Sequence, residues 1–237
     1  MLKFELRMVS QRMLSWCDTE SWARSELQAP TKTRFTKSES EFRNMENTAN
    51  TCQSSETDLN LILTALVKDI YDGLIIIEAE CIKERAALAR TACLEHQSIR
   101  NEWWADLLAL HRNLLHDYYD YVMASQHPLG NTSLRRLVSE NTIPQRMWYH
   151  GIYSFLELLK YYLPASREHI LTFTYYSYAL IALLYEVVPV FQNSWLDMLV
   201  DLTYYIIDIE DNNTQEREVW KEVACYWYSK RKFIRIS

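Results

Sequence analysis

Glycine is scarce in this chain, with 3 residues among 237. Open α/β sheets and β-barrels use glycine in tight turns, because it adopts backbone angles that other residues avoid. The scarcity therefore favours helices joined by short polar loops. An excess of positive charge is missing too, since 25 Lys and Arg are outnumbered by 31 Asp and Glu. A formal charge of −6 is not that of a strongly basic nucleic-acid-binding domain.

Paired cysteine motifs are also missing. The cysteines are scattered and none forms a CxxC pair: Cys17, Cys52, Cys81, Cys93 and Cys225. An odd number of scattered thiols is typical of reduced cysteines in the cytosol or nucleus. Charged residues interrupt the start, MLKFELRMVSQRML, too often for the apolar segment of a secretory signal peptide. We therefore expect a soluble intracellular protein of the nucleus or cytoplasm.

The sequence lacks the motifs of common enzyme classes. It contains no GxGxxG or GxxxxGK loop to hold phosphates and no HExxH metal motif. His111 and His116 would lie about 140° apart around a helix and would not share a metal ion. A solvated face is the favoured explanation for the acidic cluster Asp208, Glu210, Asp211, Glu216 and Glu218. We expect no enzyme, no cofactor, no metal site and no small-molecule substrate.

Apolar residues are abundant, at 49% of the chain, and the stretch 143–188 is the richest in them. Pro144 suits a first helical turn. The apolar residues after it recur every three or four positions, which places them on one helix face: Trp148, Ile152, Phe155, Leu156, Leu159 and Leu163. Pro164 ends that helix, and Ser166 is a suitable N-cap for a second one reaching Val188. This pattern predicts an antiparallel hairpin around which the rest of the chain is organised.

The second helix of this hairpin has no acidic or basic residue between Ile170 and Tyr185. A helix that is apolar all round lies either in the centre of a bundle or inside a membrane. A membrane span needs about 20 such residues. This run is shorter and contains Thr172, Thr174 and Ser177. Burial in a protein core is the favoured interpretation, and a membrane helix is the alternative.

The rest of the chain divides into three parts. Residues 1–56 form a mostly disordered arm, because the polar stretch from Gln28 to Glu56 has too few apolar residues to fold. Residues 57–230 form an all-α domain, and 231–237 form a basic tail. Besides the hairpin, helices are expected at 58–83 with a weaker continuation at 86–97, and at 101–125, 133–140, 193–209 and 215–228. Short connections make this an antiparallel helical bundle or a stack of helical hairpins.

A few basic residues are candidates for binding nucleic acid through its phosphates: Arg135, Arg136, Arg146, Lys230, Arg231 and Lys232. Contacts from Lys and Arg to phosphate supply most non-specific affinity, and Tyr or Trp could stack on bases. The alternative, favoured on the residues alone, is that the tyrosines fill the core and the bases lie on ordinary helix surfaces.

Several segments together resemble a known family: IYDGLIIIEAECI (70–82), HRNLLHDYYDYVMASQHP (111–128), LRRL (134–137), MWYHGIYSFLELLKYYLPAS (147–166), ALLYEVVP (182–189) and REVWKEVACYWYSK (217–230). They are similar to fungal proteins with a telomerase-activating DNA/RNA-binding domain of the Ever-Shorter-Telomeres type. That domain is shared with the SMG adaptors of nonsense-mediated mRNA decay. The resemblance implies an all-α fold, 14-3-3-like and then TPR-like, and an adaptor that binds proteins, telomeric or messenger RNA, or both.

This chain departs from the family pattern in two places. The segment LVDLTYYIIDIED (199–211) resembles LGDLxRYRxxIED, so two expected arginines are replaced by Tyr204 and Ile206. Relatives also continue past YSK with further helical hairpins, whereas this chain has RKFIRIS. A truncated or diverged member is expected, with the 193–228 helices left partly uncovered.

Three functions are compatible with these observations. The first is a non-enzymatic helical adaptor associated with single-stranded RNA or DNA, or with a ribonucleoprotein, in telomere maintenance or RNA decay. The second is a pure protein-interaction module of the phosphopeptide-binding type, without nucleic acid. The third is a membrane-associated helical protein. The resemblance favours the first.

Overall fold

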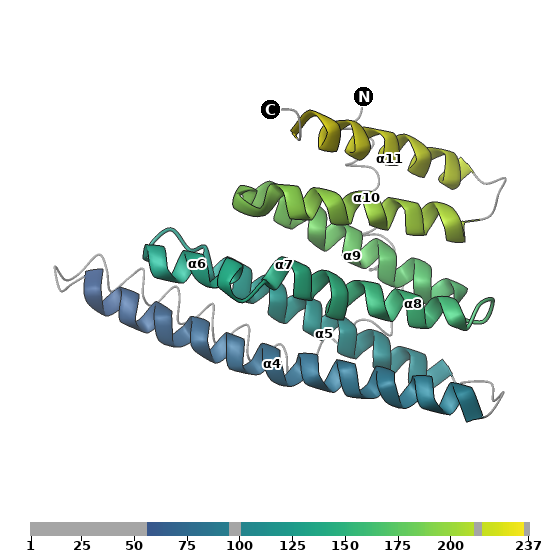
Figure 1. The fold of residues 1–237 in the computed structure, drawn as a ribbon, viewed down its shortest axis with the longest axis horizontal. Coiled ribbons are helices and arrows are strands. Elements are labelled where there is room, and N and C mark those ends of the chain that lie inside the picture. Colours follow the sequence, from purple (N-terminus) through teal and green to yellow (C-terminus); the bar gives the residue numbers. More distant parts are fainter. Residues whose placement is uncertain (1–55, 95–100, 211–214, 235–237) are drawn as a thin grey trace. The chain divides into compact units, whose positions relative to one another are not determined.

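A computed structural model describes residues 56–94, 101–210 and 215–234 (Figure 1). These residues contain helices and no strand, which confirms the predicted all-α fold. By compactness the chain divides into two units, Met1–Ile62 and Leu63–Ser237. The predicted arm 1–56 lies, except for Glu56, outside the described residues. The packing described below is that of the second unit.

The first described helix, α4, runs from Glu56 to Leu94 without a break. The weaker continuation predicted at 86–97 is therefore part of the same helix, which the structure describes as far as Leu94. Its buried apolar side chains recur every four or seven residues: Leu63, Val67, Leu74, Cys81 and Leu88. Alanine is the best helix former, and neither glycine nor proline occurs between 83 and 94, so the stripe continues through the Ala-rich segment.

Two helices follow α4 in the order expected. Helix α5 covers Asn101–Ser125, and α6 covers Thr132–Glu140. Asn131 caps α6, because its side-chain oxygen accepts a hydrogen bond of 2.8 Å from the backbone N–H of Leu134. Helix α6 packs against α5 and against the start of the central hairpin.

The central hairpin is present, but its first arm is not one regular helix. It consists of α7 (Ile143–Arg146), a π-helical segment η1 (Met147–Tyr153) and α8 (Ser154–Tyr161). The second arm, α9, runs from Arg167 to Val187 and packs against α8. Ser166 is the N-cap residue of α9, as predicted, but its buried hydroxyl makes no capping hydrogen bond and donates instead to the carbonyl oxygen of Leu159.

Helix α9 contacts α5, α8 and α10 (Gln192–Ile209), and α11 (Gln215–Ile234) covers a further part of it. From α11, Trp227 Nε1 donates a hydrogen bond of 2.9 Å to Tyr178 Oη. Among the described helices, α9 is the one long and apolar enough to cross a membrane, and 44% of its most apolar stretch is buried in the protein. Its neighbours cover several sides of this helix, while Leu183 and Val187 are exposed.

Helix α11 is longer than predicted. Its buried residues Trp220, Ala224 and Trp227 recur at helical spacing. The helix continues to Ile234, so the predicted basic tail 231–237 begins inside it. The short 3₁₀ turn Pro189–Phe191 joins α9 to α10.

Candidate interaction groove

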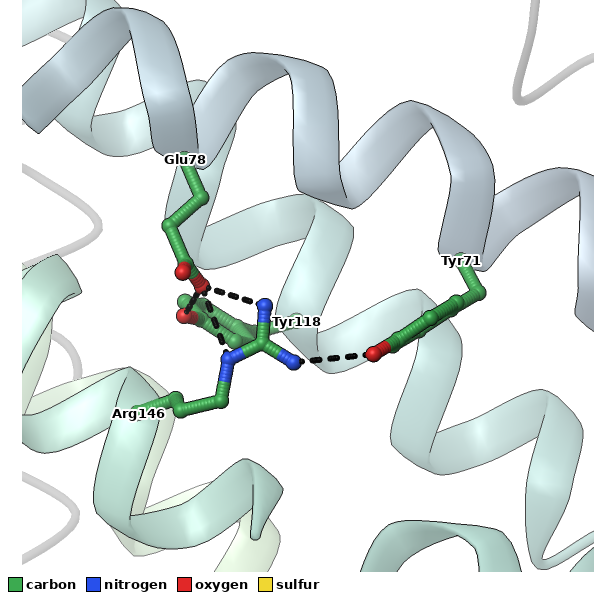
Figure 2. A network of polar contacts seen from close by, with 4 residues as sticks. All are labelled: Tyr71, Glu78, Tyr118 and Arg146. Atoms are coloured by element: carbon green, nitrogen blue, oxygen red, sulfur yellow. Dashed lines mark hydrogen bonds and ion pairs between the residues drawn. The ribbon is translucent and has the colours of Figure 1, made fainter. Parts of the chain in front are cut away.

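Of the predicted phosphate-binding residues, Arg146 lies deepest in the protein. Its side chain is 18% exposed, and its Nε and Nη2 atoms lie 3.2 and 2.9 Å from Glu78 Oε2. Its Nη1 atom donates to Tyr71 Oη at 3.2 Å, and Tyr118 donates its hydroxyl proton to Glu78 (Figure 2). Glu78 balances the charge of this guanidinium group, so a phosphate would have to displace it. Arg146 ties α7 to α4 and does not extend a surface of free bases.

The two bases of α6 are exposed. Arg135 Nη2 donates to the carbonyl oxygen of Pro128 at 2.9 Å. Arg136 Nε lies 3.9 Å from Glu140 Oε1, and both side chains are more than half exposed. Exposed pairs of this kind contribute little to stability and exchange partners easily. Arg135 and Arg136 are therefore accessible to an anion.

The bases of α11 are mostly engaged with protein groups. Lys230 Nζ lies 4.8–5.3 Å from the ring centroids of Tyr185, Tyr226 and Trp227. Arg231 Nη1 lies 3.6 Å from Asp197 Oδ1, while Lys232 is exposed. The six predicted bases thus lie on α6, in the core beside α4, and on α11. Phosphate binding by any of them stays a prediction.

A groove not predicted from the sequence lies between η1, α8 and α10. It encloses about 280 Å³. Its lining consists of four aromatic rings, two carboxylates and one ammonium group: Trp148, Tyr153, Tyr204, Tyr205, Asp201, Asp208 and Lys160. The charges are mixed, with acidic groups in the majority.

The π-helical turn sets the aromatic wall of this groove. In a π-helix hydrogen bonds join residues five apart, so side chains at that spacing lie close to the same face. Trp148 and Tyr153 are five residues apart, and their rings stack with centroids 6.1 Å apart. Trp148 was predicted to share a helix face with Ile152, which is buried, but Trp148 lies at the groove. The segment is wound differently from the α-helix that the prediction assumed.

Helix α5 holds the π-helical turn in place through Gly151. His111 Nδ1 lies 3.0 Å from the carbonyl oxygen of Gly151, and the His111 ring stacks on Phe155 at 4.0 Å. Because a carbonyl oxygen can only accept, Nδ1 carries the proton and donates it. Burial lowers the pKa of His111 to about 3, so the ring is neutral at physiological pH. A Cβ atom at Gly151 would lie 2.9 Å from Leu115 Cδ2, which explains the glycine.

The opposite wall of the groove belongs to α10. Asp201, Tyr204, Tyr205 and Asp208 follow helical spacing and share one face. Tyr205 donates a hydrogen bond of 2.6 Å to Glu157 Oε1 on α8. Burial raises the pKa of Asp201, a shift that Arg231 opposes and Asp197 reinforces. A cation placed beside Asp201 would favour its charged form.

A second hollow of about 370 Å³ lies between α10 and α11. Its lining is mainly apolar and aromatic: Tyr204, Ile207, Lys221, Ala224, Cys225 and Tyr228. Tyr204 lines both hollows and is 49% exposed, so this ring stands between them. Of the two positions where the resemblance expects arginine, 204 therefore lies at the groove, whereas Ile206 is fully buried.

Some of the groove residues were named in the sequence analysis, but not as members of a binding site. Tyr204 was singled out as a departure from the family pattern, and Asp208 as part of a solvated acidic face. The spacing of Trp148 and Tyr153 around a glycine was the one available signal for the π-helical turn, and it is a weak one. Among the described residues, no three His, Cys, Asp or Glu side chains are grouped so that they could hold a metal ion.

The chain was compared with protein-family models, curated proteins and solved structures, and none of them matches it. The family resemblance therefore remains a prediction from the quoted segments.

Proposed function

We propose that this protein is a non-enzymatic helical adaptor whose groove between η1, α8 and α10 binds a basic segment of a partner protein. The observation that carries the proposal is the lining of the groove, in which four aromatic rings surround two carboxylates. Aromatic faces attract Lys and Arg through the quadrupole of the ring, and carboxylates pair with the same groups. Together they suit a lysine or arginine side chain that enters with its alkyl stem against the rings.

A contact inside the groove supports this chemistry. Lys160 Nζ lies 5.1 Å above the Tyr205 ring, so the chain already places one ammonium group on an aromatic face there. Asp201 and Asp208 lie one turn on either side of Tyr204 on α10. The lining carries two carboxylates and one ammonium group, so its own charge is acidic.

The same lining makes the groove a poor site for phosphate. Asp201 and Asp208 repel a nucleic-acid backbone or a phosphopeptide, and Lys160 alone does not outweigh them. Nucleic-acid association, implied by the resemblance, stays a prediction that would depend on exposed bases such as Arg135 and Arg136. The membrane alternative has less support, because the apolar character of α9 is accounted for by its contacts with α5, α8, α10 and α11.

The proposal can be tested by panning a random peptide display library on the full-length protein. We expect enriched peptides to carry Lys or Arg beside apolar residues. The same selection on Asp201→Asn/Asp208→Asn should lose that preference, because both substitutions keep the size of the side chain and remove its charge. Glu80→Gln/Asp106→Asn, which removes two exposed acids from other helices, is the matched control and should behave as the unaltered protein.

Enrichment of acidic peptides would reject the proposal, as would absence of enrichment. A basic preference that survives in Asp201→Asn/Asp208→Asn would place binding outside the groove and would reject it too. Far-ultraviolet circular dichroism of each variant shows whether the helices are intact.

A further inference from the structure

The outer face of α4 carries a stripe of residues that the fold does not cover. Asp72, Ile76, Ala79 and Lys83 are all exposed, and Ile76 is 67% exposed. They lie on the side of α4 opposite the buried residues Val67, Leu74 and Cys81. We call these four exposed residues the α4 stripe. Ile75 and Ile82, each 39% exposed, flank it on one side.

The α4 stripe has the spacing of heptad a and d positions, with Ile76 and Ala79 as its two apolar members. The intervals are four, three and four residues, which is the alternation of a and d positions in a heptad. The same alternation extends to Asp69 on one side and to Ala86 and Arg90 on the other. A single exposed isoleucine is normal on a protein surface, so the pairing depends mainly on the charged residues around it.

The charges along the α4 stripe favour a second copy of this chain as the partner, in one orientation. Acids lie in its N-terminal half, at Asp69 and Asp72, and bases lie in its C-terminal half, at Lys83 and Arg90. In a parallel pair of identical helices each position faces its own copy, so Asp72 would face Asp72. In an antiparallel pair the a positions face the d positions, so Asp72 of each copy faces Lys83 of the other.

Size complementarity fits the same arrangement. In that antiparallel register, Ile76 of one copy faces Ala79 of the other, a large side chain against a small one. The register is symmetric, so each such contact occurs twice about a two-fold axis. Lys83 Nζ lies 3.9 Å from Glu84 in the single chain, and the Lys83 side chain is 78% exposed. Lys83 can therefore exchange Glu84 for Asp72 of a second copy.

From this complementarity we infer that the protein self-associates as an antiparallel dimer through the α4 stripe. From Asp72 to Lys83 a helix advances about 17 Å, which makes a small interface. Small interfaces are characteristic of weak, transient association. The dimer therefore forms reversibly and depends on protein concentration. This inference is independent of the proposed peptide groove on η1, α8 and α10.

Sedimentation velocity of the full-length protein, over about two orders of magnitude in concentration, measures this equilibrium. We expect the weight-average mass to rise from one copy toward two. Asp72→Lys should raise the dimer dissociation constant at least about tenfold, because the introduced lysine would face Lys83 twice per dimer. Asp72→Lys/Lys83→Asp restores opposite charges in the antiparallel register and should regain the dimer.

Asp106→Lys on α5 makes the same change in net charge at another exposed position and is the matched control. It should leave the dissociation constant unchanged. A protein that stays monomeric throughout would overturn the inference. So would a dimer that Asp72→Lys leaves intact, or one that the double reversal fails to restore.

Discussion

At the scale of single residues, the buried pair Glu78 and Arg146 changes how the basic residues are interpreted. From the sequence, Arg146 is equivalent to Arg135 or Arg136, since all three lie in predicted helices. In the structure it bonds to Glu78 and Tyr71, which are 68 and 75 residues away in the chain. No local pattern encodes such a partner. Burial and pairing therefore separate a structural arginine from an accessible one only after the fold is known.

Substitution of one member of this pair should destabilise the fold. Glu78→Gln keeps the volume but leaves the Arg146 guanidinium largely buried without a counter-charge, at a cost of about 3 kcal/mol. Urea unfolding followed by circular dichroism measures this cost. Glu78→Leu/Arg146→Met removes both charges and should recover part of the lost stability, although Tyr118 then lacks its hydrogen-bond acceptor. If the double variant is as unstable as the single one, the charge pair is not what makes Glu78 important.

His111 gives the protein a sensitivity to acid. Its folded pKa, about 3, lies below the ordinary 6.5, so the unfolded chain takes up a proton that the folded chain refuses. Stability is therefore complete above pH 6.5 and is lost as the pH falls, at up to about 1.4 kcal/mol per pH unit. His111→Asn retains a donor for Gly151 and removes this titration.

We expect a shallower decline of the unfolding free energy in His111→Asn than in the unaltered protein between about pH 6.5 and pH 4. The decline should not vanish, because burial also lowers the pKa values of His116 and His169. Parallel declines in the two proteins would show that His111 is not buried as described.

At the scale of elements, the described helices were predictable where periodicity and end signals agree. Asn101–Ser125 and Thr132–Glu140 match the predicted ranges to within one residue, and α10 begins one residue early. The misses have physical causes. A period of 3.6 cannot signal a π-helical turn, and the Ala-rich end of α4 has too few large apolar residues to mark its length. The groove depends on the π-helical turn, so it could not be predicted.

Gly151→Ala tests the role of this turn. The added methyl group would lie 2.9 Å from Leu115, which is fully buried, so the side chain or η1 must move. We expect a loss of about 1–2 kcal/mol in unfolding free energy. Because η1 carries Trp148 and Tyr153, near-ultraviolet circular dichroism should change as well. Leu115→Ala frees space for the added methyl group, so Gly151→Ala/Leu115→Ala should give a spectrum closer to that of the unaltered protein than Gly151→Ala does. An unchanged spectrum in Gly151→Ala would contradict this role of the turn.

At the scale of the whole molecule, the accessible surface divides into chemically different regions. Exposed bases lie on α6, the aromatic and acidic groove lies between η1, α8 and α10, and the α4 stripe carries both charges. The composition predicted the first-order features, an all-α fold with a net acidic charge. It could not predict that the acids Asp201 and Asp208 would meet aromatic rings from a segment about 50 residues earlier.

Tyr204→Arg places arginine where the family resemblance expects it. On α10 the new side chain lies three residues after Asp201 and four before Asp208, so it would pair with them. We expect Tyr204→Arg to lose binding of basic peptides without gaining binding of single-stranded RNA, as measured by fluorescence anisotropy. A gain of RNA binding would show that this one substitution converts the groove into a phosphate-binding site. The groove would then be closer in its chemistry to the family pattern than proposed.

The most direct test of the proposed function compares two labelled probes on the full-length protein, an arginine- and lysine-rich peptide and a single-stranded RNA. Anisotropy titrations should show peptide binding that Asp201→Asn/Asp208→Asn weakens at least about tenfold, with Glu80→Gln/Asp106→Asn as the unaffected control. The peptide should also bind more weakly at acid pH, because Asp201, whose pKa is raised, takes up a proton there. Absence of peptide binding, or peptide binding that Asp201→Asn/Asp208→Asn leaves unchanged, would contradict the account.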